Sequence, residues 1–260
     1  MIKIFRKIRS AAGTADFWVL CFLALLLCVI VLVERHFECT WSRDSIMYLH
    51  HSAVYLEKGS FAGVLEYNPE YPFPPFSIGI IWLLAQVFEL ETAGMLSVLI
   101  PGCGAIVLVY FLTRLLGGSR PMALAAAVLL TVNPGVIYMA TEPTRDMPFV
   151  FWSLAAATAF TAAVKLSRPY CFALCGAFAA LALCFRHEGI EIAVLMTLFW
   201  LWMCWRERRK LWSHTRNYLL FLLGAVLTFT VLLSGFGMLK HSVVYYSCYQ
   251  QNKLQNLLEE

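Results

Sequence analysis

The stretch that decides the fold is residues 34–91, ERHFECTWSRDSIMYLHHSAVYLEKGSFAGVLEYNPEYPFPPFSIGIIWLLAQVFELE. It is polar, aromatic and rich in acidic residues, and it lies between one apolar run and a series of further apolar runs. A chain that serves only as an anchor has no use for a loop of this length and composition. We therefore expect the loop to carry chemistry, and the apolar runs around it to set the architecture.

Apolar residues dominate the rest of the chain. They make up 60% of its 260 residues, and the mean hydropathy is +0.71, which is too apolar for one soluble domain. The runs long enough, or nearly so, to cross a hydrocarbon core of about 30 Å are predicted to be helical, because the period-2 alternation of barrel strands is absent. Seven spans are expected, at Phe17–Val33, Thr92–Leu116, Pro121–Ala140, Met147–Val164, Tyr170–Phe185, Gly189–Trp205 and Asn217–Leu239.

An eighth apolar run, Phe76–Leu90, would reach only about 22 Å as a helix. If it lies on the membrane surface, 13 basic residues fall on the N-terminal side of the membrane and 7 on the other; if it spans, the counts become 8 and 12. The positive-inside rule favours the surface placement and a cytoplasmic N-terminus. On this topology fourteen of the sixteen acids face outside, and only Asp16 and Glu207 lie inside.

No linker, repeat or glycine-rich phosphate loop divides the chain, so we expect one integral membrane domain over residues 1–260, with an outer loop at 34–91 and an outer-side tail at 240–260. The basic N-terminus also fits a signal peptide, but no small-x-small cleavage site precedes Glu34, which favours an uncleaved anchor in the plasma (inner) membrane. No nucleic-acid partner is expected, because the basic segment Arg206–Arg216 better fits a contact with anionic membrane lipid. Cysteine spacing indicates no metal cluster.

Within the loop, Asp44–Lys58 is predicted to form a helix that ends at Gly59. Its apolar face carries Ile46, Leu49, Ala53 and Leu56. A second stripe carries Asp44, Tyr48, His51 and Tyr55. A carboxylate, two phenols and an imidazole on one stripe suit hydrogen bonding to a hydroxyl-rich ligand such as a sugar. The alternative is an interfacial helix whose aromatic rings lie in the headgroup layer.

The order of these elements resembles the polyprenyl-phosphate-dependent glycosyltransferases of the GT-C superfamily, in particular their protein-mannosyltransferase and aminoarabinose-transferase-like branch. The resemblance covers about residues 15–200. It rests on Arg43-Asp44 with Tyr48, Ala53 and Gly59 downstream, Tyr71-Pro72 to Pro74-Pro75, Asn133-Pro134, Glu142-Pro143 to Asp146, and Arg186 with Glu188-Gly189. It implies an all-α polytopic membrane protein of about seven transmembrane helices, with juxtamembrane helices in the first outer loop.

The resemblance also implies an activity: transfer of a hexose or pentose from a polyprenyl-phosphate carrier to a protein, lipid or glycan acceptor at the outer face, with inversion. Asp44 is then expected to be the general base. Asp146 or Glu142 would orient the acceptor, help to hold a divalent cation or position a basic partner. Arg186, backed by Arg145 and His187, would contact the phosphate. The remaining expected substrate contacts are Arg43, Tyr48, His51, Tyr55, Tyr71 and Glu188.

Structural alternatives stay open at these sites: Arg43 can simply pair with Asp44, Arg186 can be a snorkelling cation at a span end, and Glu188 can pair with Arg186. The chain also departs from the family pattern. Ser45 stands where many members carry a second acid, and His187 separates the basic and acidic positions of the third loop.

A further departure is length, because typical members have around a dozen spans. A truncated frame, a short form that works with a second subunit, and a degenerate inactive copy all remain open. A transporter or flippase-like subunit is a rival function, since Pro101 and Pro134 interrupt spans, although the charges lie at span ends instead of mid-membrane. A noncatalytic scaffold is the other rival.

Overall fold

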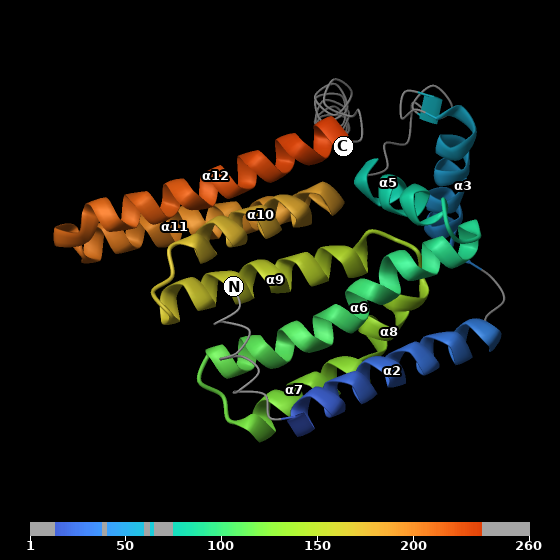
Figure 1. Ribbon diagram of the computed structural model, residues 1–260, viewed down its shortest axis with the longest axis horizontal. Helices are drawn as coiled ribbons and strands as arrows, with labels where there is room; N and C mark the ends of the chain where they lie inside the picture. The colour runs from blue at the N-terminus through green and yellow to red at the C-terminus, as the bar shows by residue number, and fades with distance from the viewer. Residues whose placement is uncertain (1–13, 38–40, 60–62, 65–74, 236–260) are drawn as a thin grey trace, which may run out of the picture.

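The computed structural model describes residues 14–37, 41–59, 63–64 and 75–235 (Figure 1). The predicted substrate residue Tyr71 and the tail at 240–260 lie outside the described residues. The described part is helical, as predicted. Its helices are α2 (Thr14–Phe37), α3 (Arg43–Lys58), α5 (Pro75–Leu84), α6 (Leu90–Leu115), α7 (Arg120–Thr131), α8 (Pro134–Thr141), α9 (Asp146–Lys165), α10 (Tyr170–Phe185), η1 (His187–Gly189), α11 (Ile190–Arg206), η2 (Arg208–Lys210) and α12 (Leu211–Gly235).

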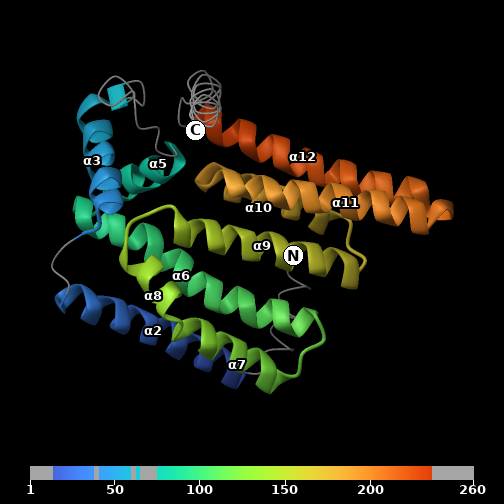
Figure 2. The ribbon, with the colours of Figure 1, turned by 180° about the vertical axis from the view of Figure 1, so that it is seen from behind.

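The long helices lie side by side in one bundle, in the order α12, α10, α9, α6 and α2 across Figure 1, while α3 and α5 cover one end. From behind, α7 and α8 lie against α6 and α2 (Figure 2). Five of the described helices, α2, α6, α9, η1–α11 and η2–α12, are long and apolar enough to cross a membrane, and the bent pair α7–α8 can supply a sixth span. The predicted fifth span, Tyr170–Phe185, is the shorter apolar helix α10.

The predicted span Pro121–Ala140 is not one straight helix, as expected from the sequence, but two helices bent by 54°. The break falls at Asn133-Pro134, where proline lacks the N–H that a continuing helix needs. Asn133 begins the second helix, because its side-chain oxygen accepts hydrogen bonds from the backbone N–H groups of Gly135 at 2.9 Å and Val136 at 3.2 Å. The kink therefore redirects α8 toward the end of the bundle that carries α3.

The apolar run Phe76–Leu90 is not a single helix either. Its helix, α5, ends at Leu84, and the next residues turn before α6 begins at Leu90. A helix of ten residues rises only about 15 Å, half of a hydrocarbon core. A helix of this length is too short to cross the membrane alone, and the placement of the run on the membrane surface stays a prediction. In the chain, α3 and α5 lie between the candidate spans α2 and α6.

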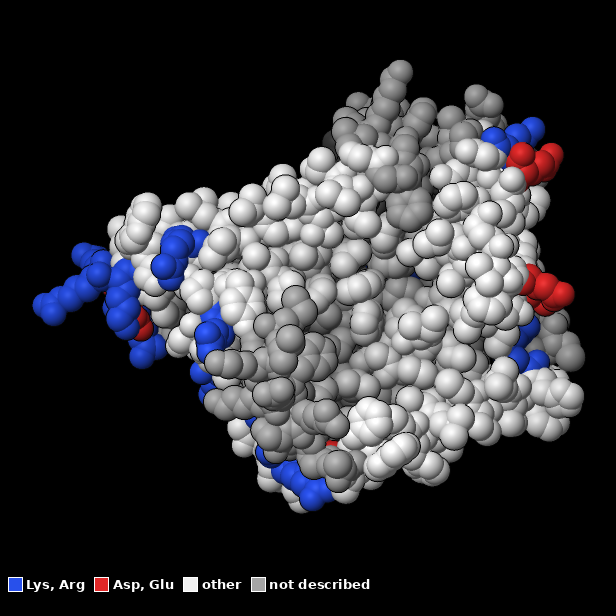
Figure 3. All heavy atoms as spheres, viewed as in Figure 1, with Lys and Arg blue, Asp and Glu red and all other residues white. Residues whose placement is uncertain are grey.

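The two ends of the bundle differ in charge. Figure 3 shows most of the visible lysine and arginine side chains where α11 and α12 meet and along the same end of the bundle, whereas the larger groups of visible acids lie at the opposite end, together with a few basic side chains. At the basic end one carboxylate is fully buried: Asp16 accepts hydrogen bonds from the Tyr110 hydroxyl and the Arg120 Nε, each at 2.6 Å. This cluster joins α2, α6 and α7.

Small residues bring the helices on the other side of the bundle into close contact, as is common in membranes. A Cβ on Gly176 of α10 would overlap the backbone carbonyl of Phe221, and one on Gly224 of α12 would overlap that of Ala173. The backbones of α10 and α12 therefore touch at two points. The core around this crossing is built largely of alanine, cysteine and phenylalanine.

Candidate active site

The start of α3 is tied to the loop that follows α8. Ser42 is the N-cap of α3, and its hydroxyl accepts a hydrogen bond from the backbone N–H of Ser45 at 3.2 Å. The Glu142 carboxylate accepts hydrogen bonds from the Ser42 hydroxyl at 2.7 Å, from the Ser42 backbone N–H at 3.2 Å and from the Ser45 hydroxyl. Glu142 is only 6% exposed. It therefore fixes the first turn of α3, and with it the position of Asp44.

A second cluster joins α9 to the segment between α10 and α11. The Arg186 guanidinium donates from Nε and Nη2 to the two carboxylate oxygens of Glu188, at 3.2 and 3.0 Å, and from Nη1 to Asp146. These bonds, the one to Glu188 first, raise the pKa of Arg186, so it stays charged. Guanidinium has five N–H donors, which leaves two for a further anion. The expected alternative, that Glu188 pairs with Arg186, is thus confirmed.

Gly189 allows this arrangement. A Cβ at this position would overlap the backbone of Leu183 and Ala182 in α10. Only glycine lets η1 fold back so closely on the preceding helix. Glu188 is consequently held beside Arg186, whose guanidinium carbon also lies 5.7 Å from the ring centre of Phe149.

Asp44 differs from the acids just described. It lies in the first turn of α3 and is exposed, and within the described residues its carboxylate has neither an ion pair nor a hydrogen bond. The alternative in which Arg43 pairs with Asp44 is not found there, because no ion pair joins these two side chains. An exposed carboxylate without a donor is able to take up a proton, which is what a general base needs.

The other three residues of the predicted polar stripe are buried. Tyr48 and His51 are each 2% exposed, and Tyr55 is 6% exposed, packed against Trp82 at 4.9 Å between ring centres. Burial raises the pKa values of both tyrosines and lowers that of His51. These side chains pack between α3, α5 and α6, so their contact with a ligand stays a prediction.

Tyr48 also shows that the predicted charges lie near one another. Burial is the largest cause of its raised pKa, and four charges, those of Arg145, Asp146, Asp44 and Arg186, act on its hydroxyl as well. The start of α3, the segment between α8 and α9 and the segment between α10 and α11 therefore lie near this tyrosine. Arg145 is half-buried and, among the described residues, has no carboxylate partner. His187 is half-buried in η1.

Two contacts were missed from the sequence. Ser42 is not among the residues predicted for the site, and Ser45 is predicted only as a departure from the family pattern, although a serine just before a helix is a recognisable N-cap signal. The Arg35 guanidinium lies 3.4 Å from the ring centre of Trp41, which joins the end of α2 to the start of α3. Within the described ranges, no group of three His, Cys, Asp or Glu side chains could hold a metal ion.

Comparison with known protein families gives a match over most of the described helices. The family model described as dolichyl-phosphate-mannose-protein mannosyltransferase matches residues 72–234, which is well over half of the chain. The match includes Glu142, Asp146, Arg186 and Glu188, but α3 with Asp44 precedes it. No curated protein and no solved structure matches. The chain belongs to the dolichyl-phosphate-mannose-protein mannosyltransferase family and is a membrane glycosyltransferase of the GT-C type.

Proposed function

We propose that this chain transfers a sugar from a polyprenyl-phosphate carrier to an acceptor hydroxyl, with inversion at the anomeric carbon and with Asp44 as the general base. One observation supports the proposal: the Asp44 carboxylate is exposed and has no partner among the described residues, and it lies in the turn of α3 that Glu142 fixes, near Arg145 and the Arg186 cluster. A base for the acceptor and cations for the departing phosphate are thereby available in one place.

The proposed reaction is an in-line displacement. The Asp44 carboxylate takes the proton of the acceptor hydroxyl, whose oxygen bonds to the anomeric carbon as the bond from that carbon to the carrier phosphate breaks. The phosphate leaves with the electron pair and meets Arg145 and the two remaining N–H donors of Arg186. Asp146 and Glu188 orient Arg186, and no step needs a cofactor. A divalent cation near the phosphate is compatible with this scheme.

We further propose that the site faces the outside of the plasma (inner) membrane and that the N-terminus is cytoplasmic. The basic end of the bundle then faces the cytoplasm, in keeping with the positive-inside rule. The family description names mannose, and a mannosyl phosphate carrier is therefore the first donor to test. A hydroxyl on protein, lipid or glycan is the acceptor class, and a second subunit would act on the acceptor side.

The test is transfer of radiolabelled sugar from polyprenyl-phosphate donors in membranes that contain the wild-type chain, Asp44→Asn or Glu57→Gln. Glu57 is a matched control, because it is another exposed acid of α3, at the far end of the helix. We expect Asp44→Asn to lower transfer by about 100-fold or more and Glu57→Gln to leave it unchanged. Undiminished transfer by Asp44→Asn would remove the general base from the proposal; no transfer by the wild type from any donor would count against the activity itself.

A further inference from the structure

The turn between α11 and α12 concentrates positive charge. Residues 206–210 contain four cations and one acid. The acid, Glu207, already pairs with Lys210, whose Nζ lies 2.9 Å from its carboxylate, and His214 Nε2 lies 3.6 Å away. The hydrogen bond from Lys210 lowers the pKa of Glu207. Arg208 and Arg209 are exposed, and neither has a carboxylate partner within the described part of the chain. Two guanidinium groups are thus left to bind an anion.

Exposed indoles flank these cations. Trp205 is 71% exposed and Trp212 is 78% exposed, one on each side of the turn. The Arg206 guanidinium carbon lies 5.1 Å from the ring centre of a third indole, that of Trp202. Tryptophan is enriched where a membrane meets water, because its ring is apolar and its N–H is polar. The turn therefore combines side chains that suit the headgroup layer with side chains that suit phosphate.

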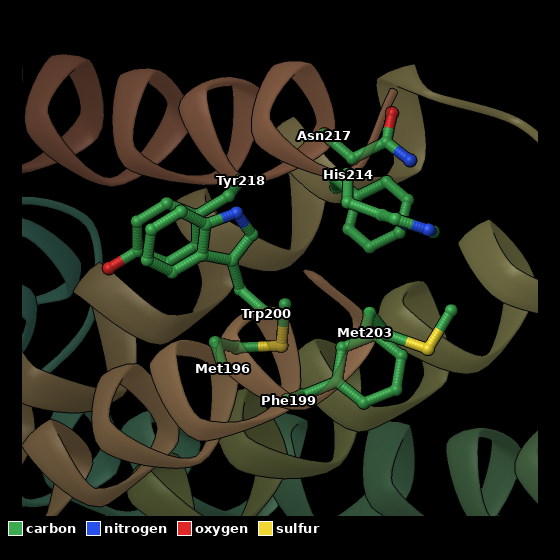
Figure 4. Close-up of a pocket in the computed structure, with 8 residues that line it drawn as sticks. Met196, Phe199, Trp200, Met203, His214, Asn217 and Tyr218 are labelled. Carbon is green, nitrogen blue, oxygen red and sulfur yellow. The ribbon is translucent and has the colours of Figure 1, made fainter. Parts of the chain in front are cut away.

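Side chains of α11 and α12 next to the turn lie close together around a small cavity (Figure 4). Tyr218 of α12 stacks on Trp200 of α11 with 4.8 Å between ring centres, and its hydroxyl lies 2.9 Å from that of Thr197. His214, which contacts Glu207, also faces the small cavity between the two helices. These contacts hold α11 and α12 together and so keep the turn that carries the cations in place.

We propose that the turn Arg206–Trp212 is a binding site for the phosphate headgroup of an anionic phospholipid, with Arg208 and Arg209 on the phosphate and Trp205 and Trp212 at the boundary with the acyl chains. Charge complementarity selects this occupant, because lysine and arginine side chains near a membrane surface are attracted to anionic lipid headgroups. The exposed tryptophans favour a lipid as the ligand, because acyl chains give their rings an apolar surrounding and a bound nucleic acid would leave the rings in water. The site lies at the opposite end of the bundle from Asp44 and does not depend on the proposed transfer reaction.

The experiment measures equilibrium binding of fluorescent phosphatidylglycerol, and of phosphatidylcholine with the same label, to the full chain in neutral detergent. We expect the wild type to prefer phosphatidylglycerol at least about fivefold and the double variant Arg208→Gln/Arg209→Gln to lose this preference. The control Lys165→Gln/Arg168→Gln removes two exposed cations from the same end of the bundle and should keep it. Equal loss in both doubles, no preference in the wild type, or displacement of the lipid by a short oligonucleotide would each overturn the proposal.

Discussion

The two ends of the bundle use carboxylates differently. At the basic end Asp16 is fully buried and is bound by Tyr110 and Arg120. At the other end Asp44 is exposed and, within the described residues, has no such donor, while its neighbour Glu142 is bound by three donors from the start of α3. A carboxylate that accepts hydrogen bonds from several elements ties those elements together, whereas one without such donors can accept a hydrogen bond from an incoming hydroxyl. This contrast separates structural acids from candidate catalytic ones.

Removing the buried acid, Asp16, is the strongest test of this contrast. Asp16→Asn leaves the Arg120 charge and the Tyr110 hydroxyl with a weaker partner, and we expect a loss of about 2 kcal/mol in the free energy of unfolding. The estimate is modest because the Arg120 side chain is 54% exposed. Transfer per folded molecule should be unchanged. Thermal unfolding in detergent and transfer normalised to folded protein measure the two effects.

Glu207→Gln is the control for that prediction, because Glu207 is the other acid of the basic end and lies at its surface turn. It should change the unfolding temperature little. A larger destabilisation by Glu207→Gln than by Asp16→Asn would mean that burial does not decide which acids support the fold.

Glu142 is a structural acid that lies next to the proposed general base, so Glu142→Gln should affect activity through the position of α3. An amide keeps one acceptor but presents N–H groups to the serine hydroxyls, so the first turn of α3 shifts. We expect transfer to fall about tenfold or more, since small displacements of a catalytic group are costly, with donor KM nearly unchanged. The double variant Ser42→Ala/Ser45→Ala should likewise lower kcat and leave the donor KM nearly unchanged. A changed KM with a normal kcat would instead place Glu142 in contact with substrate.

Arg186→Lys tests the second cluster. Lysine keeps the charge but cannot fork between the two oxygens of Glu188 while also reaching Asp146. We expect the donor KM to rise about tenfold, equivalent to 1.4 kcal/mol, with little change in unfolding temperature. Transfer rates at several donor concentrations give the KM. A lysine variant with the wild-type KM would show that donor binding does not need the bidentate contact between Arg186 and Glu188.

The smallest effect concerns pH. Burial lowers the pKa of His51 below its ordinary value of about 6.5, so the unfolded chain binds protons that the folded chain does not. The stability from neutral His51 is present above that ordinary value and is lost as pH falls toward the folded-state pKa. His51→Gln should therefore flatten the drop in unfolding temperature between pH 7.5 and pH 5. The exposed neighbour His50→Gln should leave the drop in place.

Much of the helical architecture could be predicted from the sequence, because it depends on local patterns. The helix that ends at Gly59 ends there, with φ of 64° at that glycine, and α10 has the bounds expected from its apolar run. The break at Asn133-Pro134 was visible as a dipeptide, yet its 54° bend depends on packing against α6 and α2. A continuous span was accordingly expected where two helices exist.

The site could be predicted only in part. Sequence spacing placed Asp44, Asp146 and Arg186 on one side of the membrane, but nothing in it linked Glu142 to serines about a hundred residues earlier. Nor could it tell which stripe of α3 faces the protein. Ile46 is 52% exposed while Tyr48 and His51 are buried, because a helix at a membrane surface can leave apolar side chains to the lipid.

The close approach of α10 and α12 at Gly176 and Gly224 has a consequence for how this sequence can change over time. Any side chain at either position must push α10 and α12 apart, and these two helices carry Arg186 at one end and the basic turn at the other. A single methyl group at this crossing would thus displace the elements that carry both clusters. Variation in descendants of this chain should accordingly accumulate on the lipid-facing sides of α11 and α12, while these two glycines stay fixed.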